Sequence, residues 1–166
     1  MKGLSSVGFI GGGLMATAII KGLLKQGYAA ERFMVSDPDS TRREILGKLG
    51  IKTFQDNSEM LIALESKEVE GVILAVKPQV VKEALTDVKI PELPLLSIVA
   101  GFPVSSLEIL LPEAKVLRAM PNTPALIGEG ITAITAGTRS GEPEIKWAKE
   151  ILSSLGAVVT IPESLM

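Results

Sequence analysis

The sequence has no cysteine and no histidine among its 166 residues. These absences exclude a thiolate nucleophile, a zinc site with cysteine ligands and a serine–histidine–aspartate triad, because each depends on one of the two side chains. Disulfide bonds are excluded as well, which is compatible with a reducing cytoplasm. A metal site built from carboxylates alone stays open in principle, but no loop is crowded with alternating Asp and Glu, so we predict no metal site.

Positive charge and long apolar runs are also scarce. The 17 Lys and Arg residues are outnumbered by 19 Asp and Glu residues, and they form no basic block. A nucleic-acid surface would show clustered Lys and Arg, so we predict no nucleic-acid partner. No run approaches the ~18 apolar residues of a membrane span. The apolar stretch 7–20 imitates a signal peptide, but glycines interrupt it and its small residues lie inside it, so we predict a cytoplasmic protein without membrane contact.

What the sequence does contain is an alternation of apolar runs and helical periodicity. Apolar residues make up 46% of the chain, which allows the core of one domain. Short apolar runs predict strands at 7–10, 33–35, 51–54, 72–76, 95–99, 116–120, 131–135 and 157–161. Helices are predicted between most of these strands, the last over 142–155. The alternation indicates an α/β fold of Rossmann type, a doubly wound, mostly parallel sheet with helices on both faces.

The first motif is a glycine-rich turn directly after the first strand. Gly11, Gly13 and Ala16 fit the pattern G-x-G-x-x-G/A. In that pattern the first glycine makes a tight turn, the second lets a pyrophosphate approach the backbone, and the small third residue lets the helix pack on the strand. Free N–H groups at the helix start then point at the phosphate oxygens. Because the motif follows a strand and opens a helix, we favour a dinucleotide site over a glycine turn without a ligand.

A second signal is an acidic residue at the end of the second strand. Asp37 comes 21 residues after Ala16, about where a Rossmann domain places the group that contacts the adenosine ribose. The alternative is a set of residues that caps the next helix, and Asp39 or Ser40 fits that role. We predict a ribose contact for Asp37.

The same segment bears on the choice of cofactor. An acid at position 37 favours NADH, because it accepts a hydrogen bond from the ribose 2′-OH. Ser36 is adjacent, and Arg42 and Arg43 follow, and arginine matches phosphate geometry with paired donors. The alternative for the arginines is a solvated helix face. We predict that NADP(H) is favoured and NAD(H) is also accepted, with Pro38 turning the Asp37 carboxylate aside.

Two further loops follow strand ends. Ala75-Val76-Lys77-Pro78 ends the fourth strand, where ligands bind in open α/β sheets. The alternative is a solvated lysine followed by a proline that starts a helix. Met120-Pro121-Asn122-Thr123-Pro124 begins a region, 121–130, too rich in turn formers for a helix or a central strand. We interpret it as a functional loop whose prolines hold the Asn and Thr in place, the alternative being a structural turn.

Together these segments resemble the pyrroline-5-carboxylate reductase family along nearly the whole chain, from Val7 to Met166. The most specific pieces are Gly8–Gly13, Ala75–Pro78, Val99–Gly101, Met120–Pro124 and Gly128–Gly130. The resemblance implies an NAD(P)H-dependent oxidoreductase of proline biosynthesis. Such an enzyme passes hydride to the C=N carbon of Δ1-pyrroline-5-carboxylate and gives L-proline.

The resemblance also implies roles for particular residues. It assigns the cofactor pyrophosphate to Ile10, Gly11, Gly12, Gly13, Leu14 and Met15. The adenosine end would lie near Asp37 and Asn57, and the nicotinamide near the Met120–Pro124 loop with Asn122. The approach to the nicotinamide ribose would be lined by Ala75, Val76, Lys77 and Pro78.

Family members continue into a helical domain that grips the substrate carboxylate and builds a homo-oligomer. We therefore expect residues 1–162 to form the nucleotide-binding domain and residues 163–166 to begin the linker to that domain. The isolated chain is then expected to bind cofactor without turnover. A cyclic imine can take its proton from water and the cofactor carries the hydride chemistry, so no histidine is needed, and Thr123 is the only hydroxyl nominated as catalytic.

Two other functions remain open from the sequence. A β-hydroxyacid or prephenate dehydrogenase has a similar nucleotide-binding half, although the Met-Pro-Asn-Thr-Pro loop favours the imine reductase. A dinucleotide-binding module without catalysis is the other, and the chain end at Met166 is its support.

Overall fold

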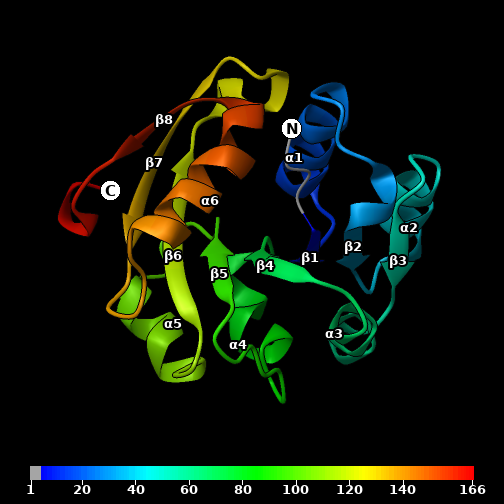
Figure 1. The fold of residues 1–166 in the computed structure, drawn as a ribbon, viewed down its shortest axis with the longest axis horizontal. Helices are drawn as coiled ribbons and strands as arrows, with labels where there is room; N and C mark the ends of the chain where they lie inside the picture. The colour runs from blue at the N-terminus through cyan, green and yellow to red at the C-terminus, as the bar shows by residue number, and fades with distance from the viewer. Residues whose placement is uncertain (1–4) are drawn as a thin grey trace.

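A computed structural model describes residues 5–166, which form one eight-stranded sheet flanked by helices (Figure 1). The strand order is β3-β2-β1-β4-β5-β6-β7-β8. Neighbouring strands run parallel except β6 and β7, which are antiparallel. The predicted doubly wound, mostly parallel sheet is therefore confirmed. The strands are β1 (Ser6–Ile10), β2 (Phe33–Ser36), β3 (Lys52–Phe54), β4 (Val69–Leu74), β5 (Pro94–Ser97), β6 (Lys115–Pro121), β7 (Gly130–Ala136) and β8 (Gly156–Thr160).

Helices cover both faces of the sheet. The α-helices are α1 (Leu14–Lys25), α2 (Ser40–Gly47), α3 (Asn57–Glu65), α4 (Val81–Ala84), α5 (Val104–Leu110) and α6 (Glu142–Leu152). Short 3-10 helices are η1 (Ala30–Arg32), η2 (Pro78–Val80), η3 (Thr123–Ile127), η4 (Ser153–Leu155) and η5 (Glu163–Leu165). Apolar residues of α1, α2 and α6 share one core cluster, and those of α3, α4 and α5 share the other. None of the helices among residues 5–166 has both the length and the apolar character needed to cross a bilayer.

The alternation of side chains along β1 divides the core between the two faces. Val7 and Phe9 point to the α1 side, where the Phe9 ring meets the Phe33 ring edge-on at 6.3 Å, whereas Ile10 points to the α3 side. All five β1 residues are buried, as expected for a central parallel strand covered on both faces. This burial fixes the end of β1, and with it the start of the glycine-rich turn.

Several predicted boundaries shift in the structure. The strand expected at 72–76 runs over Val69–Leu74, so Ala75 to Lys77 lies in a loop. Pro78 starts a 3-10 turn rather than an α-helix. The helix expected over 142–155 stops being α-helical at Leu152. The predicted cap at Asp39 is confirmed, because its side chain accepts the N–H of Thr41.

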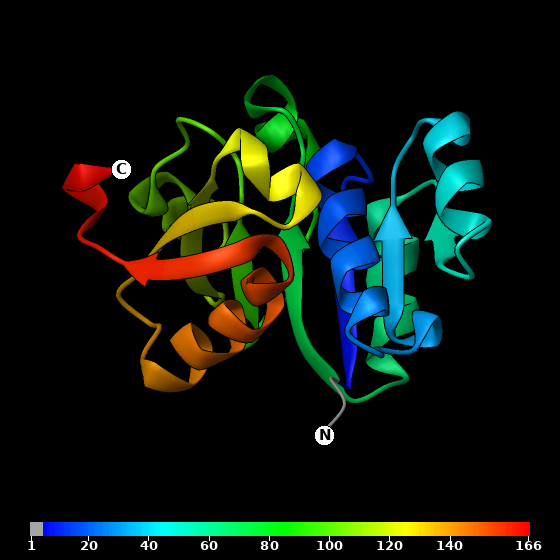
Figure 2. The ribbon, with the colours of Figure 1, turned by 90° about the horizontal axis from the view of Figure 1, so that it is seen from above.

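The structure of residues 121–130 differs from the prediction. We expected no helix there, but Thr123–Ile127 forms a 3-10 helix that ends at Gly128, which has a φ of +82°. A proline at the start of a helix removes a donor that would have no partner in any case, so a proline-rich segment can still open a short helix. The consequence is that η3 packs beside α1, near the glycine-rich turn (Figure 2).

Candidate functional site

The carboxyl end of β1 leads into a turn in which Gly11 has a structural role. Its φ is +99°, a conformation that L side chains rarely adopt. Its N–H donates to the carbonyl oxygen of Ser36 at 2.8 Å, and an added Cβ would lie 2.6 Å from the carbonyl oxygen of Ala75. The turn therefore lies between the ends of β2 and β4, and a glycine is required for the chain to pass there.

Gly12 is enclosed from the other side. An added Cβ would lie 2.8 Å from Cδ1 of Leu46 on α2, and the Gly12 N–H donates to Oδ2 of Asp37 at 2.8 Å. Gly12 is thus held between the α2 helix and the end of β2. The middle of the turn is packed against protein atoms and offers no room for a ligand.

Gly13 differs from both of its neighbours. Its φ of −72° and ψ of −168° suit any residue, and an added Cβ would meet no atom within 4 Å. Gly13 is also the N-cap of α1, and no side chain caps the first-turn N–H groups of this helix. The space that a side chain would fill, next to a helix N-terminus, fits an anionic phosphate group. A phosphate contact at Gly13 stays a prediction.

Ser36 and Asn57 form a network inside the protein. Ser36 is fully buried, and its hydroxyl lies 2.6 Å from Oδ1 of Asn57 and 3.3 Å from the carbonyl oxygen of Phe9. Asn57 in turn donates from Nδ2 to the carbonyl oxygen of Ala84 at 2.8 Å. In this arrangement Ser36 supports Asn57, and only the half-buried Asn57 is near the surface.

Asp37 also turns inward, which is not the open ribose contact that its position predicts. Its Oδ2 accepts the Gly12 N–H, and its Oδ1 accepts the Asp39 N–H at 2.9 Å. Arg42 Nη1 lies 3.3 Å from Oδ2, while 43% of the Arg42 side chain stays exposed. Arg43 Nη1 donates to the carbonyl oxygens of Asp37 and Pro38, each at 2.8 Å. Of the two arginines, Arg42 therefore carries the more accessible cation.

The loops after β4 and β6 reach the same edge of the sheet as the glycine turn. The Ala75 N–H donates to the carbonyl oxygen of Ile10 at 2.8 Å, and Lys77 and Pro78 are exposed beyond it. Asn122 closes the β6–β7 loop, because its Oδ1 accepts the N–H of Ile131 at 3.0 Å. Thr123 is exposed at the start of η3. The structure thus brings these predicted residues together along one edge.

Sequence reasoning missed a buried ion pair next to this edge. Arg118 on β6 has 8% of its side chain exposed, and its Nη1 donates to Oε1 of Glu163 at 2.9 Å. The same Glu163 oxygen accepts the Val104 N–H at 2.9 Å, at the start of α5. A single arginine inside an otherwise apolar strand was the available signal, because a charge is seldom buried without a partner.

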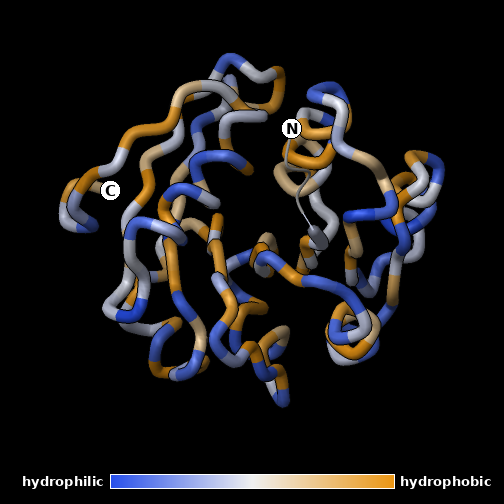
Figure 3. Tube along the Cα trace, viewed as in Figure 1, coloured by the Kyte–Doolittle hydropathy of each residue, from blue (hydrophilic) through white to orange (hydrophobic). Residues whose placement is uncertain are grey.

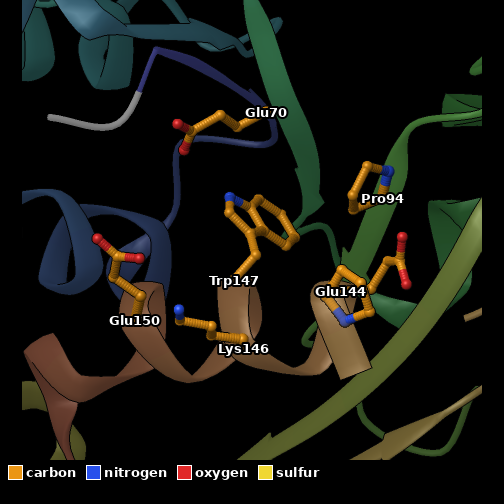
Figure 4. A pocket seen from close by; sticks show the side chains of 7 residues that line it. Glu70, Pro94, Glu144, Lys146, Trp147 and Glu150 are labelled. Atoms are coloured by element: carbon orange, nitrogen blue, oxygen red, sulfur yellow. The ribbon is translucent and has the colours of Figure 1, made fainter. Parts of the chain in front are cut away.

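Two hollows lie elsewhere on the molecule. One, of about 310 Å³, is lined by Trp147 and by residues that include Glu70, Pro94 and Glu150, toward the starts of β4 and β5 (Figure 4). Burial raises the pKa of the adjacent Tyr28, and its hydrogen bond to Glu150 adds to the shift. Another hollow, of about 340 Å³, lies at the same strand ends beneath α3. Ligands of open α/β sheets bind at the carboxyl ends instead, so the open loop edge is the candidate site.

The sheet order and the glycine turn after β1 define a Rossmann-type domain. The chain belongs to the family described as NADP oxidoreductase, coenzyme F420-dependent, whose profile matches residues 6–101. The pyrroline-5-carboxylate reductase of Haemophilus influenzae is 40% identical over 159 residues, which cover 93% of this chain and 57% of that protein. The enzyme of the same name from Synechocystis is also 40% identical, over 96% of this chain and 60% of that protein. The predicted resemblance is confirmed, and the chain spans less than two thirds of the length of these relatives.

Solved structures give the same result. A pyrroline-5-carboxylate reductase from Coxiella burnetii superposes with a TM-score of 0.86 at 28% identity, over 96% of this chain and 59% of that one. A Plasmodium falciparum pyrroline carboxylate reductase with NADP bound has a TM-score of 0.75 at 25% identity, over 96% and 57%. A prephenate dehydrogenase from A. aeolicus has a TM-score of 0.78 at 15% identity, over 98% and 61%, a likeness of fold alone.

Proposed function

We propose that this chain is the nicotinamide-dinucleotide-binding part of a pyrroline-5-carboxylate reductase. The enzyme would transfer hydride from NAD(P)H to the C=N carbon of 1-pyrroline-5-carboxylate and produce L-proline. The observation that carries the proposal is the open space at Gly13 beside the uncapped start of α1. The substrate is inferred from the relatives named pyrroline-5-carboxylate reductase.

The residues of this chain would bind and orient the cofactor, which supplies the hydride. The N–H groups of the first turn of α1, at Leu14 and Met15, would bind the pyrophosphate. The loop from Ala75 to Pro78 would line the ribose next to the nicotinamide, and the β6–β7 loop with Asn122 would hold the ring. Thr123 would be the polar hydroxyl closest to the reacting carbon, and a basic imine would take its proton from water.

The relatives are longer than this chain, and their additional length is where the rest of the enzyme would be found. We propose that substrate-binding residues and the contacts of a homo-oligomer belong to that additional length, so the chain alone binds cofactor without turnover. The protein would act in the cytoplasm. Turnover of pyrroline-5-carboxylate by the isolated chain at ordinary enzyme rates, ~1–10³ s⁻¹, would contradict this part of the proposal.

The test of cofactor binding is Gly13→Val, followed by calorimetry with NADPH and NADH. The valine would occupy the phosphate space while its φ and ψ stay unstrained, so binding of both cofactors should fall at least ~100-fold, which corresponds to ~2.7 kcal/mol. Gly141→Val is the matched control, because Gly141 is also a helix N-cap with no atom closer than 3.8 Å to an added Cβ. Wild-type affinity in Gly13→Val would place the phosphates elsewhere and refute the proposal.

For cofactor choice, we propose that NADP(H) is favoured and NAD(H) is accepted. The Asp37 carboxylate is already bonded within the protein, and the exposed part of Arg42 offers a cation to a 2′-phosphate. Arg42→Ala should weaken NADPH binding ~10-fold or more, the value of one charge-assisted bond, and leave NADH binding nearly unchanged. Calorimetry with both cofactors measures the ratio, and equal weakening of the two would rule out this role for Arg42.

A further inference from the structure

We propose that Asp37 is a positioning residue that holds the glycine turn in its phosphate-binding shape, and that it does not read the adenosine ribose. The inference rests on the proposed function, because it assumes that a dinucleotide binds at Gly13. It assigns a different role to the residue that the motif spacing marks as the ribose contact.

The first support is that the carboxylate is shielded. Its side chain is 3% exposed, and its own N–H donates to the carbonyl oxygen of Phe54 at 3.0 Å, which ties the residue to the end of β3. A ribose hydroxyl outside the protein surface would have to displace protein atoms to reach either oxygen. The backbone bond to Phe54 opposes the movement that would expose it.

The second support is that the acceptor positions of the carboxylate are largely used. A carboxylate offers about four lone-pair positions. Gly12 N–H and Arg42 Nη1 lie 2.8 and 3.3 Å from Oδ2, and Asp39 N–H lies 2.9 Å from Oδ1. A ribose hydroxyl would compete with groups that are already bonded, so its net gain in free energy would be small.

The third support is the effect of the Gly12–Asp37 hydrogen bond on Gly13, the next residue. Gly12 is packed against Leu46 and bonded to Asp37, so its peptide plane has one orientation. That plane is followed directly by Gly13 and the first turn of α1, where the phosphate would bind. A turn held in this shape before binding loses less conformational entropy when the ligand arrives. The effect of Asp37 should therefore reach every ligand that carries a pyrophosphate, whatever its ribose bears.

The test is Asp37→Asn, measured by calorimetry with NADH and NADPH and by NMR titration with adenosine 2′-phosphate, which has no pyrophosphate. The asparagine keeps the size of the side chain and replaces one accepting oxygen by a donor. We expect NADH to weaken ~10-fold and NADPH to weaken as well, because both carry the pyrophosphate. The affinity for adenosine 2′-phosphate should stay within about twofold, which corresponds to ~0.4 kcal/mol. Glu44→Gln is the control, because Glu44 lies exposed on α2, where its carboxylate pairs with Lys48 and makes no contact with the turn.

The alternative role predicts a different pattern. If Asp37 read the 2′-OH, Asp37→Asn would weaken NADH selectively and leave NADPH unchanged or tighter, which would overturn the inference. A second readout needs no ligand and uses Asp37→Ala, which removes both accepting oxygens. The Gly12 amide should exchange with solvent at least ~10-fold faster in this variant, while the Thr17 amide, bonded to Gly13, should not change. Unchanged Gly12 exchange would also overturn it. Failure of the wild-type chain to bind either cofactor would instead refute the proposed function.

Discussion

The corner formed by β1, α1 and β2 and the corner formed by β6, β7 and β8 belong to the same sheet but are built differently. In the first corner both strands are buried throughout, and the polar groups of the turn are bonded to one another. In the second, β8 is an edge strand of which no residue is buried. Ile131 and Val159 are 55% and 44% exposed there, and Figure 3 shows apolar residues along this edge.

The two corners are also held by different forces. The register pairs Ile131 with Ala157 and Ala133 with Val159, so these four residues share the face opposite α6, and no described helix covers it. The β5–β6 ladder and the core shared with α6 join this corner to the rest of the sheet, and the ion pair of Arg118 and Glu163 ties η5 to β6. We therefore expect substitutions in the packed first corner to cost more stability than substitutions on the open face of the second.

The largest effect should come from changing the packed part of the first corner. Gly11→Ala would force a side chain into a φ of +99° and against the Ala75 carbonyl, at a cost of ~2–5 kcal/mol from strain and overpacking. Urea denaturation measures this loss in the free energy of unfolding. Gly13→Ala, in the same turn, should change it by less than ~0.5 kcal/mol. Similar losses in the two variants would mean that Gly13 is packed as tightly as Gly11.

An intermediate effect should come from the ion pair of the second corner. Glu163→Gln would leave the buried Arg118 guanidinium without its charged partner, and the Glu163 side chain is partly exposed, so we expect a loss of ~1–3 kcal/mol. Glu142→Gln, at an exposed position in the first turn of α6, is the control and should cost ~0.5 kcal/mol or less. A Glu163→Gln protein as stable as wild type in urea would show that this corner does not need the pair.

The smallest effect should come from the open face of the second corner. Ile131→Lys would place a charge in solvent, so the free energy of unfolding should change by no more than ~0.5 kcal/mol. Ile134→Lys, three residues along the same strand, would bury an unpaired charge and should prevent folding. Thermal unfolding by circular dichroism compares the two. A large loss in Ile131→Lys would indicate that this face is covered in solution.

Much of the fold was predictable because it depends on local patterns. Apolar runs at strand length located all eight strands, with ends shifted by a few residues, and Gly27 and Gly50 have the positive φ expected where helices end. The 3-10 helix at Thr123–Ile127 was missed, since proline and glycine content alone does not separate a turn from a helix that starts at a proline. Strand ends were misplaced where the apolar run continued beyond the last ladder bond, as at Ala75 and Val76.

In the candidate site, too, local patterns predicted positions along the chain but not side-chain directions. The spacing of Gly11, Gly13 and Ala16 marked the turn, and the positions of Ala75 and Asn122 marked the loops beside it. The direction of each polar side chain was not readable from the spacing. Asp37 lies at the predicted place, but its carboxylate bonds to the Gly12 N–H. Ser36 lies beside it, but its hydroxyl bonds to Asn57.

The sequence by itself determined the α/β class, the glycine turn and the edge of the sheet where a ligand would bind, because periodicity and glycine spacing act over a few residues. Only the tertiary structure decided which polar groups face a ligand. Asp37 and Gly12 are 25 residues apart in the chain, and Arg118 and Glu163 are 45 apart. Such pairs depend on how strands and helices pack, and a buried donor or acceptor bonds to whichever partner that packing brings within reach.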